Sequence, residues 1–297
     1  MKNKNKLVIL LGILLLALSA CGYLTPYEKA IKKGQRDGEV ISYHDNGFLH
    51  MKANLKDGKL HGNYEVYHSH YNGGILQRGT YFEGKKEGIW TYYFRLSTPK
   101  IEKKGLYIND KKEGIWIYYG FTSEAAIREV NYYKNDKLEG ESSVYYLPND
   151  ELAERKYYKD GRLEGEFVKY YKNGQIKNKK FYKNGEISGK EVTYFEDGSM
   201  KSEVDHSLKK GEYRAYYNSG ALKEKVECTF GKKNGKGIEY RLDGSLLAKR
   251  EYRNDRIVKE RYYDEKGNIT KTMLLDENNH LVEATTIRSF FSNIFDD

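Results

Sequence analysis

Short runs of aromatic and β-branched residues alternate with polar turn residues along most of the chain. The clearest unit spans residues 165–189: one run precedes Asn173-Gly174 and a second precedes Asn184-Gly185. Asn-Gly between two such runs is a strong β-hairpin signal, because both central residues of a type I′ turn need positive φ. The same turn chemistry recurs at Asp160-Gly161, Asp197-Gly198 and Asp243-Gly244. Each unit is therefore predicted to be a hairpin, and the chain an antiparallel meander of about twenty strands.

The unit repeats through the chain with a glycine followed five residues later by a tyrosine. Steps of 22 to 26 residues separate these glycines, and a period of that size indicates a repeat array in which no unit buries its face alone. A tenth unit keeps the tyrosine but has Val258 in place of the glycine. The repeat glycines are Gly38, Gly62, Gly88, Gly114, Gly140, Gly165, Gly189, Gly211 and Gly235. The repeat tyrosines are Tyr43, Tyr67, Tyr93, Tyr119, Tyr145, Tyr170, Tyr194, Tyr216, Tyr240 and Tyr263.

The strand period of two assigns these positions to faces. Residues one, three and five places after the repeat glycine (+1, +3, +5) share one face, and those at +2, +4 and +6 share the other. The +5 tyrosines are thus expected to form a ladder of core aromatic residues, and neighbouring rungs must stack because one hairpin buries too little surface to offset its ordering entropy. The predicted fold is all-β: an elongated array of about ten stacked hairpins.

Both ends of an open sheet need protection. Near the start, Thr25, Pro26 and Glu28 supply an N-cap, a first-turn proline and a capping-box acid, and predict a short helix. Near the end, apolar residues at helical spacing predict an amphipathic helix that caps the last hairpin, with partner docking and membrane insertion as alternatives. These apolar residues are Ile287, Phe290, Phe291, Ile294 and Phe295.

The first twenty residues differ from the rest of the chain. Basic residues precede an apolar run from Leu7 to Leu18, which is typical of a secretory signal peptide. Leu18-Ser19-Ala20-Cys21 also resembles the bacterial lipobox, which implies that Cys21 carries a lipid after cleavage; an ordinary residue behind an ordinary signal peptide is the alternative. The predicted organisation is a signal peptide (1–20), a tether and short helix (21–37), the repeat array (38–283) and a capping helix (284–297).

Charge and cysteine content limit the partner classes. The formal charge is +9, but lysines and acids alternate throughout, so the charges are predicted to lie on solvated faces, and nucleic acid is not expected as a partner of an exported chain. With Cys21 lipidated, only Cys228 remains, which rules out an intramolecular disulfide in the mature chain. Cys228 lies in an alternating segment and is predicted to be a buried thiol rather than a reactive one.

Three segments carry a family resemblance: residues 87–93 (Glu-Gly-Ile-Trp-Thr-Tyr-Tyr), 113–119 (Glu-Gly-Ile-Trp-Ile-Tyr-Tyr) and 164–174. They resemble MORN repeats, and more closely the variant repeats of bacterial proteins grouped as YwqK-type antitoxins. The resemblance implies a twisted sheet of stacked hairpins that serves as an interaction or membrane-proximal scaffold without enzymatic activity. The antitoxin grouping implies a toxin as partner.

The second to fifth repeats have longer first turns than the sixth. Equivalent turns of a stacked array lie along one edge, and insertions on one side often mark a binding edge. Neutral variation in solvent loops is the alternative. The predicted partner-binding residues are Tyr71, Asn72, Arg95, Leu96, Phe121, Thr122, Leu147 and Pro148.

No motif for phosphate binding, zinc hydrolysis or an activated serine occurs. His68 and His70 are too few for a metal site, and the acids do not converge. We therefore expect no catalytic residue, cofactor, metal or small-molecule substrate. The predicted function is a non-enzymatic protein-binding scaffold, tethered by lipid to the outer membrane or to the outer face of the cytoplasmic membrane. The alternatives are neutralisation of a toxin and binding of envelope glycan through outward tyrosines such as Tyr171.

Overall fold

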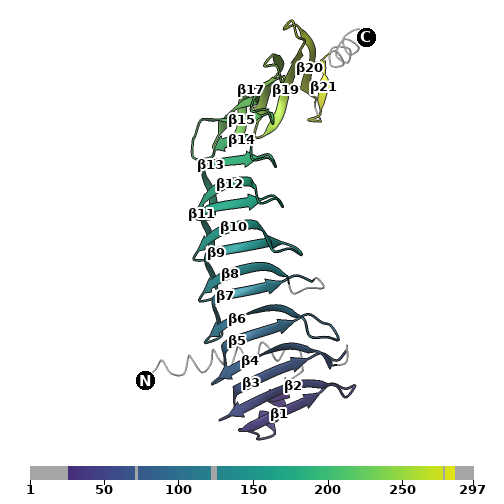
Figure 1. Cartoon of the computed structure of the whole chain (residues 1–297), viewed down its shortest axis with the longest axis vertical. Helices are drawn as coiled ribbons and strands as arrows, with labels where there is room; N and C mark the ends of the chain where they lie inside the picture. The colour runs from purple at the N-terminus through teal and green to yellow at the C-terminus, as the bar shows by residue number, and fades with distance from the viewer. Residues whose placement is uncertain (1–25, 71–72, 122–125, 277, 285–297) are drawn as a thin grey trace, which may run out of the picture. The chain divides into compact units, whose positions relative to one another are not determined.

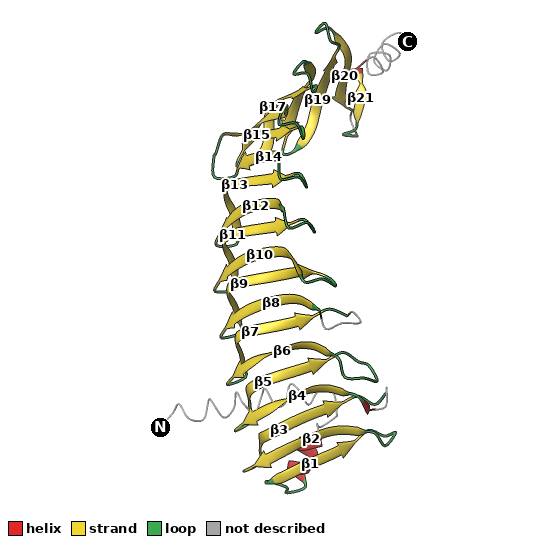
Figure 2. Ribbon diagram, viewed as in Figure 1, coloured by secondary structure: helices red, strands yellow, loops and turns green. Residues whose placement is uncertain are grey.

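A computed structural model describes residues 26–70, 73–121, 126–276 and 278–284. These residues form one open antiparallel β-sheet with a single short helix, and consecutive strands are hydrogen-bonded neighbours (Figures 1 and 2). The predicted all-β hairpin array and the short N-terminal helix are confirmed. The signal peptide, Cys21 and the C-terminal helix lie outside the described residues. No helix in the described ranges is long and apolar enough to cross a membrane.

The sheet divides into two compact units. The first holds the described residues up to 121 together with Tyr133–Asp136, and the second holds Ala126–Tyr132 and the residues from Lys137 onward. The first contains α2 (Pro26–Lys32), β1 (Gly38–Tyr43), β2 (Leu49–Lys56), β3 (Lys59–Tyr67), β4 (Ile75–Phe82), β5 (Lys85–Tyr93), β6 (Ile101–Ile108) and β7 (Lys111–Tyr119). β8 (Ile127–Lys134) contributes residues to both units.

The second unit continues the same meander. It contains β9 (Lys137–Tyr146), β10 (Glu151–Lys159), β11 (Arg162–Tyr170), β12 (Ile176–Lys183), β13 (Glu186–Tyr194), β14 (Met200–Asp205) and β15 (Gly211–Tyr216). It ends with β16 (Leu222–Thr229), β17 (Lys232–Tyr240), β18 (Leu246–Arg253), β19 (Arg256–Tyr263), β20 (Ile269–Leu275) and β21 (Leu281–Glu283).

Six of the nine repeat glycines lie in a β-bulge, namely Gly62, Gly88, Gly114, Gly165, Gly189 and Gly235. Between β6 and β7, Gly105 faces Trp116 but the next pair is Leu106 with Glu113, so Gly114 and the residue after it have no partner on β6. Gly114 has φ +62°, a left-handed conformation that a residue with a side chain adopts at a cost. In the tenth repeat, where the glycine is missing, only one residue, Val258, has no partner on β18. The glycine is therefore required where the bulge contains two unpaired residues, as it does at Gly114.

A second bulge precedes the repeat tyrosines. Tyr92 faces Lys103 but Tyr93 faces Ile101, which leaves Glu102 as the extra residue on β6. The same one-residue shift occurs at eight other repeat tyrosines, namely Tyr43, Tyr67, Tyr145, Tyr170, Tyr194, Tyr216, Tyr240 and Tyr263. Bulges re-aim side chains and increase twist, so each hairpin turns its strand end in the same way.

The turns fall into two kinds, which corrects part of the sequence prediction. At one end of the hairpins, two-residue turns such as Asn184-Gly185 have positive φ at both residues, as type I′ requires. At the other end, Asn173 does not have positive φ and only Gly174 does. Tyr171 and Gln175 close a longer loop there, and Gly174 N donates to Tyr171 O at 3.0 Å. Asn173-Gly174, Asp197-Gly198 and Asp243-Gly244 therefore form turns ended by a left-handed glycine, not type I′ turns.

The deepest side chains lie at the +2 position. Trp90 and Trp116 are fully buried, and a Cβ on Gly105 would lie 2.3 Å from the Trp116 indole. Each indole N–H donates to a strand carbonyl at 3.1 Å, Trp116 to Leu106. The ammonium of Lys112 lies 4.5 Å from the centroid of the Trp116 ring and helps to cover it. A one-layer sheet thus buries its largest side chains beneath neighbouring rings and lysine stems.

The first strands of the first unit enclose a small aliphatic core. Val40, Met51 and Leu55 are buried together, and Ala30 and Ile31 of α2 pack against this cluster. α2 lies beside β1 in Figure 2. The helix therefore covers the exposed start of the sheet, as the sequence predicted for an open array.

Candidate partner-binding loop edge

The candidate site is the set of loops that follow the repeat tyrosines, named here the loop edge. In the first unit it comprises residues 44–48, 68–70 with 73–74, and 94–100, together with 120–121. Each loop starts at the +6 position, directly after the tyrosine and its bulge. The bulge sets the angle at which each loop leaves the sheet.

Side chains at +6 tie each loop to the next repeat. His44 Nε2 lies 3.0 Å from the carbonyl oxygen of Tyr67. In the second unit, the hydroxyl of Tyr171 donates to the carbonyl of Tyr194 at 2.8 Å. Tyr146 and Tyr217 donate in the same way to the carbonyls of Tyr170 and Tyr240. The loop edge is therefore held by a series of bonds that run from one repeat to the next.

The enlarged loops of the first unit contact one another. A Cβ on Gly74 would lie 2.5 Å from the carbonyl oxygen of Leu96, so only glycine allows these two loops to approach so closely. His68 Nε2 lies 3.3 Å from the same oxygen. Phe94 and Phe121 meet edge to face with ring centroids 5.1 Å apart. Loops of the second, third and fourth repeats thus form one continuous surface.

This surface presents groups suited to a protein partner. Phe121 is 67% exposed and Arg95 is exposed, while the ammonium of Lys100 lies 5.4 Å from the centroid of the Phe121 ring. A recess of 490 Å³ lies at the base of the loop and is lined by Tyr93, Phe94, Arg95 and residues of β3, β4 and β6. An exposed aromatic ring and an arginine beside a recess are the residue types that most often dominate binding energy at interfaces.

The other predicted contact residues have different positions. Leu96 is half-buried by the loop contacts just described. Leu147 is 36% exposed in the second unit and is joined to Pro148 by a cis peptide bond. Asn149 Nδ2 donates to Glu151 Oε1 at 3.4 Å in the same loop. Tyr71, Asn72 and Thr122 lie outside the described residues.

The repeat tyrosines vary in burial. Tyr93 is buried, Tyr43 is 65% exposed, and the other eight are half-buried. Several have a cation above the ring from the preceding strand: Arg78 lies 5.8 Å from the Tyr93 centroid and Lys249 lies 5.5 Å from that of Tyr263. Burial and a 2.6 Å hydrogen bond to Glu65 raise the pKa of Tyr67 to about 12. The face that carries the tyrosines is therefore a series of half-buried rings and cations.

Sequence reasoning missed the role of the glutamate that precedes four of the nine repeat glycines, namely Gly88, Gly114, Gly140 and Gly165. Glu164 Oε2 accepts a 2.7 Å hydrogen bond from the backbone N–H of Asn184, in the turn of the next hairpin. Glu139 accepts in the same way from Asp160 at 2.8 Å. Recurrence of Glu-Gly in the sequence was the signal that could have revealed this link. The glutamate satisfies a turn N–H that the type I′ hairpin leaves unpaired.

The two loop histidines do not converge on a common point. His68 is directed at the Leu96 carbonyl, and Ser69 Oγ lies 2.9 Å from His70 Nδ1. Within the described ranges, no group of three or more His, Cys, Asp or Glu side chains is placed to hold a metal ion.

Comparisons with known proteins identify one hairpin. Residues 163–184 match the family model described as MORN repeat variant, so the chain carries a repeat of this kind in β11 and β12. No curated protein matches the chain. The crystal structure of TarM shares 13% identity over 32% of this chain and 19% of that chain, with a TM-score of 0.25. The crystal structure of TcdB2-TccC3-Cdc42 shares 11% identity over 83% of this chain and 16% of that chain, with a TM-score of 0.19. The chain spans less than a fifth of either.

Proposed function

We propose that this MORN-type hairpin array is a non-enzymatic scaffold whose loop edge binds a protein partner. The observation that carries the proposal is the continuous surface of the first unit, where the loops contact one another and leave Phe121 and Arg95 exposed. A rigid surface built on a sheet loses little conformational entropy on binding, which favours affinity.

We further propose that the chain is a lipoprotein, tethered through Cys21 to the outer membrane or to the outer face of the cytoplasmic membrane. The support is the sequence Leu18-Ser19-Ala20-Cys21 after a basic and then apolar segment. Cys21→Ser should abolish incorporation of a labelled fatty acid and release the protein from the membrane fraction. Retention of label and membrane association by Cys21→Ser would contradict the tether.

The role of the loop edge is tested by crosslinking the full-length protein in intact cells, followed by affinity purification. The double variant Arg95→Ala/Phe121→Ala should lose a protein that the parent chain enriches. The matched control is Lys85→Ala/Phe82→Ala, which removes an exposed cation and an exposed ring at the opposite ends of the strands. Equal recovery from both double variants, or no enriched protein with the parent chain, would reject the proposed edge.

The same experiment addresses the antitoxin alternative. A partner that stops growth when expressed without this chain, and does so again with the Arg95→Ala/Phe121→Ala variant, would make the scaffold a toxin neutraliser. A partner that is harmless alone would leave the scaffold proposal in place and remove the toxin interpretation.

A further inference from the structure

A row of cations crosses the second unit on the face that carries the repeat tyrosines. The Cα register places Lys225 opposite Ile238, Ile238 opposite Lys249, and Lys249 opposite Arg261. Adjacent strands lie about 4.8 Å apart, so these side chains form a line perpendicular to the strands. Beside this line, Lys236 faces Glu251 and Glu251 faces Lys259.

At two other places on this face the cations are paired with carboxylates. Arg155 and Lys179 flank Glu166, at 3.3 and 2.5 Å. Arg214 lies 3.7 Å from Glu203 and 2.6 Å from Glu212. These ion pairs balance part of the positive charge locally.

Across β16 to β19 the pattern changes. Within the described ranges, no carboxylate pairs with the side chains of Lys225, Lys236, Lys249 or Arg261, and only Lys259 has an acid, Glu251 at 3.8 Å. The local excess of positive charge is therefore available to a ligand.

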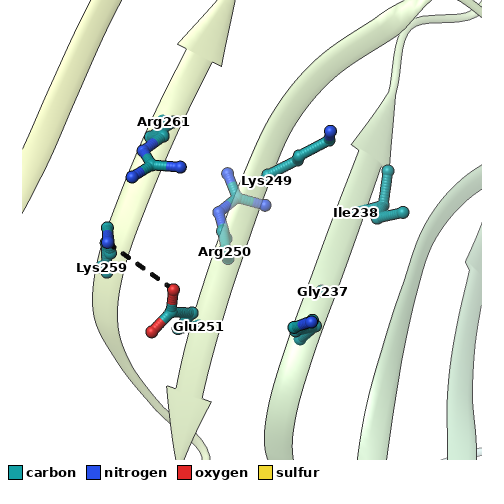
Figure 3. Close-up of a pocket in the computed structure, with 8 residues that line it drawn as sticks. Gly237, Ile238, Lys249, Arg250, Glu251, Lys259 and Arg261 are labelled. Atoms are coloured by element: carbon teal, nitrogen blue, oxygen red, sulfur yellow. Dashed lines mark ion pairs between the residues drawn. The ribbon is translucent and has the colours of Figure 1, made fainter.

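The cations surround a recess. A cavity of 330 Å³ is lined by Lys236, Ile238, Lys249, Glu251, Lys259 and Arg261, with Gly237 and Arg250 between them. Figure 3 shows Lys249 and Arg261 on neighbouring strands, with the ion pair of Lys259 and Glu251 farther along them. The only acid in this lining is already paired, so the recess carries excess positive charge.

Arg250 does not add to this excess because its guanidinium is engaged on the opposite face. Its Nη2 lies 2.6 Å from Glu239 Oε2, its Nε contacts Glu260, and its Nη1 lies 3.6 Å from Glu224. On the opposite face of the same strands, Arg250 is thus paired with three carboxylates. The cations without an acid described above lie on the tyrosine-bearing face.

We propose that this recess binds an acidic polysaccharide whose carboxylates pair with Lys249, Arg261 and Lys236. Each residue of a uronic acid polymer combines a carboxylate with an apolar C–H ring face, and the recess combines cations with the apolar side chain of Ile238. The half-buried Tyr263 ring lies next to Lys249, with 5.5 Å between the ammonium and the ring centroid. The linear row of charges suits an extended polymer. A recess of this size favours an inserted sugar over a flat membrane surface, and no exposed ring is available there to stack a nucleobase.

The test measures binding of a polygalacturonate oligomer to the soluble chain from residue 22 onward, at low and high salt. Lys249→Gln/Arg261→Gln should weaken binding about tenfold or more at low salt, and added salt should weaken binding by the parent chain. The matched control Lys159→Gln/Lys183→Gln removes two exposed cations of the same unit outside the recess and should bind like the parent. Glu251→Gln should bind more tightly, because it removes the one acid of the lining.

Three outcomes would overturn the proposal. The first is that the parent chain does not bind polygalacturonate, and the second is that both double variants weaken binding equally. The third is that polyglutamate or single-stranded DNA binds as tightly as polygalacturonate, which would indicate an acidic peptide or a nucleic acid as the ligand. Methyl-esterified polygalacturonate should not bind, and vesicles of anionic lipid should not compete. Circular dichroism of each variant is the control for folding. The proposal does not rest on the loop edge, since the recess variants leave Arg95 and Phe121 intact.

Discussion

At the residue scale, the turns of the array depend on carboxylates contributed by neighbouring repeats, both preceding and following. The glutamate before the repeat glycine accepts from a turn N–H, and Asp110 and Asp136 accept from the backbone N–H of Lys86 and Lys112 at 2.7 and 2.8 Å. These bonds link consecutive hairpins outside the ordinary strand ladder. Their repetition explains why acids recur at fixed positions of the repeats.

Replacing Glu164 with alanine should lower the free energy of unfolding by about 1 kcal/mol, because the N–H of Asn184 then loses its acceptor. Urea denaturation measures the change. The control is Glu186→Ala, since Glu186 is exposed at the same turn and its side chain makes no hydrogen bond within the described residues. Equal losses for the two variants would mean that the carboxylate does not cap the turn.

At the element scale, the strand pairs β4–β5 and β6–β7 each place a glycine opposite a tryptophan, beside the bulge at the repeat glycine. Trp116 reaches its buried position because Gly105 leaves room for the indole and because the bulge at Gly114 turns the strand. Gly79 and Trp90 repeat the arrangement one hairpin earlier, where the added Cβ would also lie 2.3 Å from the ring. A glycine at this position therefore requires a large residue at the neighbouring +2 position.

Gly105→Ala should destabilise the first unit by about 1–3 kcal/mol, because the methyl group overlaps the Trp116 ring. Tryptophan fluorescence during urea denaturation reports this unit, since Trp90 and Trp116 are the only tryptophans. Combining Gly105→Ala with Trp116→Leu should cost less than the sum of the single changes, because the overlap is removed. Strict additivity would show that the methyl group is accommodated elsewhere.

At the scale of the whole molecule, the two units are stabilised by different chemistry. The first buries Trp90 and Trp116 at the +2 position, whereas the second has the carboxylate of Glu191 at the same position and the partly buried Glu203 on the opposite face. Burial opposes ionisation of Glu191, but hydrogen bonds from Asn178 and His206 outweigh it and lower its pKa. Burial is likewise outweighed at Glu203, where a hydrogen bond from Tyr216 and ion pairing lower the pKa.

The second unit should therefore be the more sensitive to acid. A carboxylate whose pKa is lower in the folded than in the unfolded chain stabilises the fold above its unfolded pKa of about 4.3, and this contribution is lost as the pH falls through the folded value. Reaction of the buried Cys228 with dithiodipyridine, in a Cys21→Ser chain, should begin at a higher pH than the change in tryptophan emission. An earlier tryptophan change would contradict this order, and Glu191→Gln should flatten the pH dependence.

Local signals were sufficient for the repeat, the hairpins and the N-terminal helix. A turn such as Asn184-Gly185 is specified by its own two residues, and a capped helix by a few neighbours, so both can be predicted without knowledge of the fold. Asn173-Gly174 has the same two residues in a different turn, because the bulge beside Tyr170 changes the strand ends that the turn must join.

The sequence by itself determined the period, the strands and the positions at which loops are enlarged. Only the tertiary structure decided which positions of the repeat are buried and which charged side chains have partners. Bulges at the repeat glycine and before the repeat tyrosine set the cross-strand register, and that register pairs residues some twenty positions apart. It places Trp116 against Gly105 and brings Arg155 and Lys179 to the carboxylate of Glu166. It also sets Lys249 beside Arg261, where neither side chain has an acidic partner among the described residues. Contacts of this kind depend on geometry between strands, which no local pattern records.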